Sequence, residues 1–287
     1  KFVENGTVTG WDDPRFPTVR GVLRRGVNLE ALRMFTLSQG ASKNVVNMEW
    51  NKFWAENKKE LDKDAKRYMA IDATRHVKLV MEDDVGENEY KLTAYHPKDP
   101  SLGKRVVRLG KEVILEQMDT EGMAVGEQIV LMRWGVVEIT GVQTNDAGVI
   151  TELTGKVKPD GNVKEAKRKL SWLCCPQIPG TVRKNSHPTT IPCELHEFDN
   201  LITKEKLEET DNFEDFINPH TLATTIVHGD VGLRNLKKGE VIQLERRGYY
   251  RVDEPYVGND RKPLVLFMVP DGKSKAMGGL KGKLAHH

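Results

Sequence analysis

Basic side chains set among aromatic rings are the feature of this sequence whose residue types and spacing could carry chemistry. They form two clusters: Arg246, Arg247 and Arg251 around Tyr249 and Tyr250, and Lys164, Lys167, Arg168 and Lys169 before Trp172. Guanidinium groups pair with phosphates and base edges, and flat rings stack on unpaired bases, so this pattern suits RNA binding. The alternative is a solvated strand face with alternating charges, and the residues alone favour that alternative.

Signals for catalysis and for metal binding are weak. Gly272-Lys273-Ser274 resembles the end of a phosphate-binding loop, but Phe267 stands where that loop needs its first glycine. The eight histidines lack metal-ligand spacing, and the three cysteines cannot form a disulfide framework or a CxxC zinc site. We therefore expect no catalytic residue and no metal ligand in this chain.

Length and charge exclude several classes of protein. With 287 residues the chain is long enough for about two domains. A formal net charge of +2 excludes a histone-like protein, although residues 1–70 are the most basic quarter. No apolar run approaches the ~20 residues that span a bilayer, and no signal peptide is recognisable. Because the chain starts with Lys1 and ends in two histidines, we expect a fragment whose last residues belong to a purification tag.

The elements that must position these residues change in kind along the chain. Asn28 can cap a helix that ends near Gly40, and residues 47–61 predict a second helix with Trp50 and Trp54 on one face. A short helix is expected at 213–217. After residue 70, short apolar or alternating runs between turn residues predict antiparallel strands in a sandwich or barrel. The predicted strands are His76–Met81, Val106–Leu109, Val113–Glu116, Gln128–Arg133, Val136–Val142, Val149–Val157, Ala166–Leu173, Val241–Leu244, Tyr249–Val252 and Leu264–Val269.

A long stretch near the N-terminus narrows these possibilities. Gly10-Trp-Asp-Asp-Pro-Arg-Phe-Pro-Thr-Val-Arg-Gly-Val-Leu-Arg-Arg-Gly26 resembles the segment that follows the active-site lysine loop in glutamyl- and glutaminyl-tRNA synthetases, a class I family. Asn47-Met-Glu-Trp-Asn-Lys-Phe-Trp-Ala-Glu-Asn-Lys-Lys59 is similar to the glutamyl branch, in its cytosolic eukaryotic type. Later stretches at 199–204, 243–250 and 269–273 agree, so the resemblance covers nearly the whole chain.

The resemblance implies an α+β fold that is mostly β, with a small helical stem-contact domain followed by two antiparallel β-barrels of the anticodon-binding type. We expect the helical domain at 1–70, the proximal barrel from 71–118 together with 191–270, and the distal barrel at 119–190. Residues 271–287 would form a flexible tail. The catalytic Rossmann domain of the family precedes the matched segment, so this fragment alone is expected to be inactive.

The resemblance also assigns residues to the tRNA. It implies Arg67 and Gln243 for the middle anticodon base and Arg246 for the third base. Because Gln243 and Arg246 are an odd number of residues apart, a bulge or a strand end must bring them to one side. Arg133 lies one residue from a position at which the glutaminyl branch carries an arginine for the first base, and we include it among the anticodon residues. The expected contacts to the tRNA body are Lys43, Asn44, Arg24 and Arg25.

The function implied is tRNA binding and anticodon recognition within a cytoplasmic glutamate–tRNA ligase. The whole enzyme would use ATP and Mg²⁺, with no cofactor expected in this fragment, and its partner would be tRNA for glutamate. We expect no membrane contact, and allow for a multi-synthetase complex formed through regions outside this chain. Two alternatives stay open: the same region of a glutaminyl-tRNA synthetase, and a stand-alone non-catalytic RNA-binding module.

Overall fold

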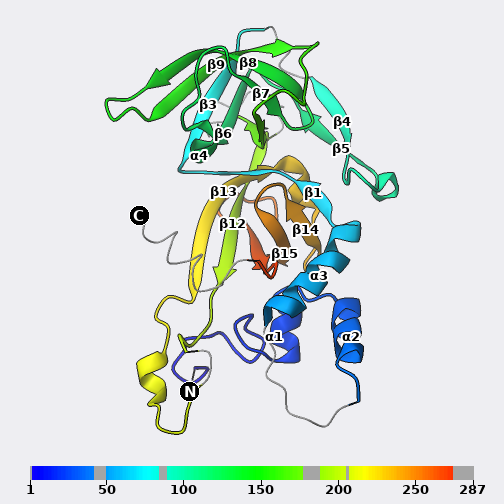
Figure 1. Cartoon of the computed structure of the whole chain (residues 1–287), viewed down its shortest axis with the longest axis vertical. Helices are drawn as coiled ribbons and strands as arrows, with labels where there is room; N and C mark the ends of the chain where they lie inside the picture. Colours follow the sequence, from blue (N-terminus) through cyan, green and yellow to red (C-terminus); the bar gives the residue numbers. More distant parts are fainter. Residues whose placement is uncertain (1, 42–49, 84–88, 177–187, 205–206, 274–287) are drawn as a thin grey trace.

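The chain folds as a helical region followed by two barrel-like sheets. The computed structural model describes residues 2–41, 50–83, 89–176, 188–204 and 207–273. Figure 1 shows the two sheets stacked along the long axis of the molecule, with the N-terminal helices beside the lower sheet. Strands outnumber helices throughout the described residues, so the expected mostly-β fold with a helical part and two barrels is confirmed.

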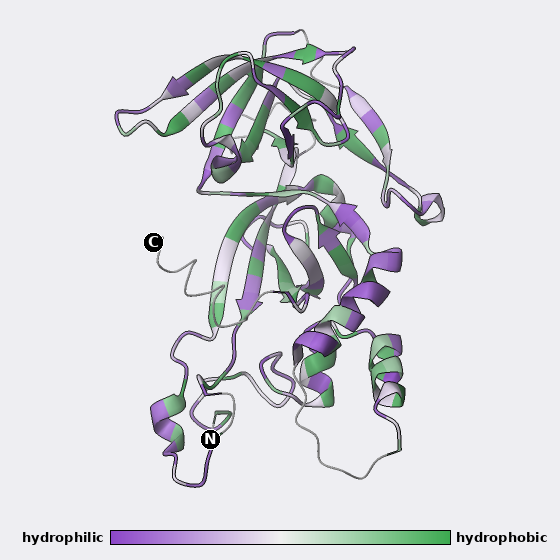
Figure 2. Ribbon diagram, viewed as in Figure 1, coloured by the Kyte–Doolittle hydropathy of each residue, from purple (hydrophilic) through white to green (hydrophobic). Residues whose placement is uncertain are grey.

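The described residues of the N-terminal region contain three helices: α1 Val19–Arg24, α2 Leu29–Ser38 and α3 Trp50–Asp64. Asn28 caps α2 as predicted, because its side-chain oxygen accepts a hydrogen bond from the Glu30 N–H at 2.8 Å. On α3 Trp54 is buried, whereas Trp50 keeps 48% of its surface exposed. Figure 2 shows that much of α3 is hydrophilic, which is typical of a helix with one packed face. The predicted start of this helix, at 47–49, lies outside the described residues, and none of the described helices could cross a membrane.

The first sheet has seven strands in the order β1-β14-β15-β16-β12-β13-β2. Their bounds are β1 Lys66–Tyr68, β2 Ala70–Asp72, β12 Thr190–Phe198, β13 Leu222–Asp230, β14 Val241–Leu244, β15 Gly248–Glu254 and β16 Leu264–Val269. Only Met69 separates β1 from β2, although these two strands form opposite edges of the sheet. The sheet must therefore curl until its edges approach each other, which makes a nearly closed barrel.

The second sheet closes in the same way. Its order is β10-β7-β8-β9-β3-β6-β11, and only Ser171 separates the two edge strands β10 and β11. Most pairs in both sheets are antiparallel, with two parallel pairs in each. The bounds are β3 His76–Met81, β6 Glu112–Glu116, β7 Gln128–Leu131, β8 Gly135–Thr144, β9 Ile150–Lys158, β10 Arg168–Leu170 and β11 Trp172–Cys174.

A separate hairpin extends from the second barrel toward the first. It consists of β4 Tyr90–Ala94 and β5 Lys104–Arg108, and the loop between them contains a 3₁₀ turn, η1 Pro100–Leu102. The backbone N–H of Arg67 in β1 donates to the carbonyl of Tyr95 at 2.9 Å, which joins the hairpin to the first barrel. The remaining elements are α4 Gln117–Thr120, η2 Phe213–Phe216 and η3 Val231–Asn235, and η2 corresponds to the short helix predicted at 213–217.

The structure corrects the expected division of the chain between the barrels. Strands β3 and β6 lie within 71–118, which we assigned to the barrel of 191–270, but both pair inside the second sheet. The chain leaves the first sheet at Asp72, whose Oδ1 accepts hydrogen bonds from the backbone of Thr74 at 2.8 Å and Arg75 at 2.9 Å. This turn directs the chain out of the first sheet and into the second. The apolar pattern of a strand predicts the strand itself but does not show which sheet it joins.

Candidate nucleic-acid interface

Two of the expected anticodon residues lie side by side on the first barrel. Arg67 in β1 pairs in register with Gln243 in β14, and Gln243 pairs with Tyr249 in β15. Side chains in register on neighbouring strands point to the same face of a sheet. The neighbours Ile242 and Leu244 fill the barrel core, so the row of Arg67, Gln243 and Tyr249 lies on the outer face, where Tyr249 packs with residues of α3. Figure 1 shows the end of α3 leading into β1 at this side of the barrel.

Arg67 is held loosely on this face. Its Nη2 donates to Asp62 Oδ1 at 3.3 Å and lies 3.2 Å from His96 Nε2, and the side chain remains 19% exposed. Its Nε is buried without a hydrogen-bond partner in the described part of the chain. The same Asp62 oxygen accepts from the Tyr249 hydroxyl at 2.6 Å, and this bond lowers the pKa of Asp62. Burial together with this bond raises the pKa of Tyr249.

Gln243 supplies the complementary group. Its amide oxygen is buried and accepts no hydrogen bond from any described residue. An unsatisfied buried polar atom costs about 1–3 kcal/mol, so native proteins keep few of them and each calls for an explanation. Here a buried unpaired donor and a buried unpaired acceptor lie on the same face of adjacent strands. That arrangement fits a ligand with both an acceptor and a donor on one edge, as a nucleobase has.

Arg246 and Arg133 occupy a different setting, the junction between the two barrels. The odd spacing of Gln243 and Arg246 is resolved by a strand end, because β14 stops at Leu244 and Arg246 takes a positive φ of 69°. Its guanidinium binds both oxygens of Asp119 in the second barrel, one of them at 2.6 Å, and these bonds raise the pKa of Arg246.

Arg133 reaches the same turn from the second barrel, also with a positive φ, of 67°. Its Nη2 donates to Oε1 of the buried Glu245 at 2.6 Å, and its Nη1 donates to the carbonyl of Ala94 at 3.1 Å. In the same turn as Glu245 and Arg246, Arg247 pairs with Glu116 of the second barrel. Three successive residues, 245 to 247, therefore each bind a residue of opposite charge across the junction. The structure does not bring Arg133 or Arg246 next to Arg67 by any contact, and their base-reading roles stay predictions.

Arg24 and Arg25, expected to contact the tRNA body, are both used inside the chain. Arg24 donates to the two oxygens of Asp253 at 2.8 Å each, which fixes α1 to the first barrel. Arg25 donates to the carbonyl of Phe198 at 2.8 Å and lies over the ring of Trp54, and burial lowers its pKa to about 10. Lys43 and Asn44 lie outside the described residues. The structure thus gives Arg24 and Arg25 structural contacts, and tRNA contact by these four residues stays a prediction.

The aromatic side chains of the two basic clusters are part of the hydrophobic cores. Tyr249, Tyr250 and Trp172 are each at most 3% exposed, and the Trp172 indole N–H donates to the carbonyl of Met132 at 2.9 Å. These rings are therefore packed inside the protein and are not free to stack on bases, so they do not support the RNA-binding interpretation of the two clusters. The alternation of basic and aromatic residues reflects strands with one face in a barrel core.

His96 and Asp62 complete the surroundings of Arg67, and neither was identified from the sequence. A single histidine before Pro97 in a loop matches no functional motif. Asp62 is one of several charged residues of α3, and nothing in the sequence distinguishes it from the others. Both become visible only because the β4–β5 hairpin and the end of α3 meet at β1.

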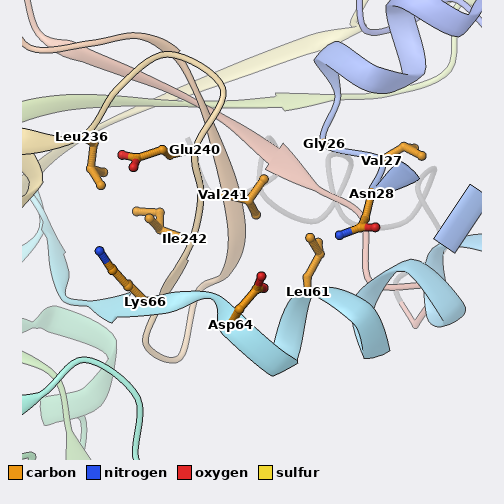
Figure 3. A pocket seen from close by; sticks show the side chains of 10 residues that line it. All are labelled: Gly26, Val27, Asn28, Leu61, Asp64, Lys66, Leu236, Glu240, Val241 and Ile242. Carbon is orange, nitrogen blue, oxygen red and sulfur yellow. The ribbon is translucent and has the colours of Figure 1, made fainter. Parts of the chain in front are cut away.

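A pocket of about 350 Å³ lies close by, between the helical region and the first barrel (Figure 3). Its charged lining residues are Asp64, Lys66 and Glu240, so carboxylates outnumber the single ammonium. The Lys66 ammonium lies 5.0 Å from the ring centroid of Tyr95. A lining with excess negative charge disfavours phosphate, and we do not include this pocket in the RNA interface.

The described residues hold no arrangement suited to nucleophilic or metal chemistry. The three cysteines are free, and burial raises the pKa of Cys174 to about 11 and of Cys175 to about 12, so both thiols stay protonated at neutral pH. Within the described ranges no three His, Cys, Asp or Glu side chains come together in a way that could hold a metal ion.

Comparison with protein families assigns the regions of the chain. A model described as "tRNA synthetases class I (E and Q), anti-codon binding domain" matches residues 65–158, and a second model of that description matches residues 185–253. A third model, "tRNA synthetases class I (E and Q), catalytic domain", matches residues 1–63. The region that we expected to be a stem-contact domain at 1–70 is thus similar to a part of the family's catalytic domain.

Similar proteins agree over nearly the whole chain. "Glutamate--tRNA ligase, cytoplasmic" of Arabidopsis thaliana is 43% identical over 95% of this chain and 36% of its own length. The protein of the same name in Saccharomyces cerevisiae is 41% identical over 98% of this chain and 37% of its own length. The "Bifunctional glutamate/proline--tRNA ligase" of Mus musculus is 38% identical over 96% of this chain and 18% of its own length.

The chain therefore spans little more than a third of the length of the first two relatives and less of the third. The resemblance to glutamyl- and glutaminyl-tRNA synthetases is confirmed by three family models that follow one another along the sequence. The two barrels, with the outward-facing Arg67 and Gln243, fall largely within the anticodon-binding domains. This chain belongs to the class I tRNA synthetases of the E and Q group.

Proposed function

We propose that this chain is the tRNA-binding and anticodon-recognising part of a cytoplasmic glutamate–tRNA ligase. The anticodon-binding domain matches support the RNA-binding role, and the names of the similar proteins support glutamate as the amino acid and the cytoplasm as the compartment. The single observation that carries the proposal is the pair Arg67 and Gln243, whose buried unpaired donor and acceptor share one face of the first barrel.

The pair would distinguish bases because a correct base satisfies the hydrogen-bonding atoms of Arg67 and Gln243, whereas a wrong base leaves at least one of them unpaired. Arg67 offers donors and Gln243 offers an amide oxygen, so the base must bring an acceptor and a donor in matching positions. A base that lacks either one leaves a buried group unpaired, which by analogy with base readout elsewhere costs about 1–3 kcal/mol. This readout requires an unstacked base, as is usual for single-stranded RNA loops.

In the whole protein the proposed reaction is the attachment of glutamate to its tRNA with ATP and Mg²⁺. Those two groups would bind in the catalytic domain, and in the residues described here no three His, Cys, Asp or Glu side chains could together hold a metal ion. The mouse and Drosophila melanogaster relatives are named bifunctional glutamate/proline–tRNA ligases, which supports, as a proposal only, an arrangement of this protein with other synthetases.

The proposal is tested by titrating the chain with tRNAs for glutamate, glutamine and aspartate at several salt concentrations. We expect the tRNA for glutamate to bind most tightly, with an affinity that falls steeply with salt because phosphate contacts release counterions. Tightest binding of the tRNA for glutamine would support the glutaminyl alternative. Equal and salt-independent binding of all three would contradict anticodon recognition and favour a protein-binding module.

A further inference from the structure

His96 lies at the base of the β4–β5 hairpin, against the proposed base-reading pair. It is only 3% exposed, and its neighbour Tyr95 accepts the hydrogen bond from the Arg67 N–H that joins the hairpin to β1. The imidazole is therefore held in place from both sides, by the hairpin backbone and by the first barrel. No role follows from position alone, and the hydrogen bonds of the ring decide what it can do.

The hydrogen bonds fix the tautomer of His96. The backbone N–H of Lys98 donates to Nδ1 at 3.2 Å, and a backbone N–H can only donate. Nδ1 must then carry a lone pair, which places the single ring proton on Nε2. The second nitrogen of His96 is thus a donor and cannot accept a hydrogen bond from another group.

This donor faces a second donor. Nε2 of His96 lies 3.2 Å from Nη2 of Arg67, and a guanidinium has no acceptor. The carboxylate oxygen that Arg67 contacts, Asp62 Oδ1, already accepts from Tyr249 at 2.6 Å and from Arg67 at 3.3 Å. No oxygen of the described residues accepts the Nε2 proton. Two donors that cannot bond to each other are held together, and a single acceptor placed between them would satisfy both.

We propose that His96 is a further specificity-determining residue, whose Nε2–H donates together with Arg67 to one carbonyl oxygen of the middle anticodon base. This inference rests on the proposed function. The amide oxygen of Gln243 would accept the ring N–H adjacent to that carbonyl. Uracil presents this edge as O4 and N3–H, whereas cytosine has an amino group in place of O4 and a lone pair on N3, so all three contacts would fail together.

Two substitutions separate base reading from a structural role. His96→Asn keeps an oxygen near the position of Nδ1, which can still accept from the Lys98 N–H, but lacks the Nε2 donor. His96→Gln keeps an amide donor near the position of Nε2 and loses the acceptor for Lys98. The probe is an anticodon stem–loop RNA of a glutamate tRNA, with uridine or cytidine at the middle position, titrated against the full chain. Thermal unfolding of each variant is measured in parallel.

We expect His96→Asn to lose about tenfold of the preference for uridine, the worth of one buried hydrogen bond, while its melting temperature stays near that of the unsubstituted chain. His96→Gln should keep most of the preference. The inference is overturned if His96→Asn discriminates as well as the unsubstituted chain, or if discrimination is lost only in proportion to stability in both variants.

The unsubstituted chain and Arg67→Ala show whether the proposed function itself holds. If the unsubstituted chain prefers uridine and Arg67→Ala does not, base reading by the first barrel stands, and a neutral His96→Asn defeats this inference alone. If the unsubstituted chain shows no preference, the proposed function fails and this inference falls with it.

Discussion

The arginine on the outer face of the first barrel differs from the arginines between the two barrels. Arg67 contacts Asp62 at 3.3 Å and leaves its buried Nε unpaired, next to the unpaired oxygen of Gln243. Arg133 and Arg246 each hold a carboxylate at 2.6 Å across the junction. A guanidinium bound closely by a carboxylate of its own chain serves the fold, whereas one with an unpaired donor beside an unpaired acceptor is available to a ligand.

An unpaired atom alone does not make a binding site, as Arg105 shows. Its Nε and Nη2 are also buried without partners in the described residues. Its guanidinium, however, pairs with the buried carboxylate of Asp230 and lies over the ring of Tyr68, so its charge is already compensated inside the chain. Accessibility and a complementary acceptor nearby are what distinguish Arg67, with 19% exposure, from Arg105.

The largest effect should come from breaking the buried structural pair. Asp230→Asn removes the charge that compensates Arg105 but keeps an oxygen that can accept from the Gly232 N–H, which Asp230 Oδ1 does at 2.9 Å. We expect the free energy of unfolding to fall by about 3 kcal/mol or more, because an uncompensated buried charge remains. Urea unfolding measures this loss.

The matched control is Glu56→Gln, which breaks the exposed pair with Lys59 on α3. Exposed pairs contribute about 0–1 kcal/mol, so this variant should unfold almost as the unsubstituted chain does. Similar losses in the two variants would show that burial does not set the importance of these pairs.

A second pair of variants should separate ligand binding from folding. Arg67→Ala should weaken preference for the cognate middle base by about 1–3 kcal/mol, since it removes the donors of the proposed site. Arg133→Ala should instead lower the free energy of unfolding by about 1–3 kcal/mol, because Glu245 is left buried without its partner, and should leave the middle-base preference unchanged. Stem–loop titrations and urea unfolding of both variants provide the two measurements.

The contrast between Arg67 as a ligand-binding residue and Arg133 as a structural residue would be wrong if the two variants showed each other's expected effects. A stability loss without a change of preference in Arg67→Ala would make Arg67 a structural residue. A loss of middle-base preference in Arg133→Ala would extend the interface to the junction between the barrels.

Local patterns in the sequence predicted helices and strands better than they predicted which side chains contact one another. The cap at Asn28 and the strand Leu264–Val269 were found because a capping side chain and a short apolar run are signals confined to a few residues. Strand β12 was missed although its burial alternates, since Pro192 in its interior argues against a central strand. The structure accommodates Pro192 because pairing with β16 begins only at Cys193.

The candidate site could be predicted only in part for the same reason. The resemblance placed Arg67 and Gln243 together, and the register of β1 and β14 does bring them side by side. The partners of Arg133 and Arg246 could not be foreseen, because Glu245 and Asp119 meet them only where the two barrels pack together. His96 likewise depends on a hairpin that crosses from one barrel to the other.

The smallest effect should appear as a pH dependence of the pair that fixes α1 to the first barrel. Burial alone would raise the pKa of Asp253, but the hydrogen bonds from Arg24 outweigh it and lower that pKa. The pair therefore contributes its full stability above the unfolded pKa of about 3.9 and loses it as pH falls through the lowered folded value. The free-energy difference between the unsubstituted chain and Asp253→Asn should be constant from about pH 7 to about pH 5 and shrink below about pH 4, with a slope under ~1.4 kcal/mol per pH unit, the limit for one proton.

Asp62→Asn is the control beside Arg67: the Asp62 carboxylate is 41% exposed, so solvent weakens the effect and the corresponding change should be smaller. An Asp253 difference that stays constant down to about pH 3 would mean that this carboxylate does not gain its proton with unfolding, and the contrast between structural and ligand-facing pairs would then not extend to their titration.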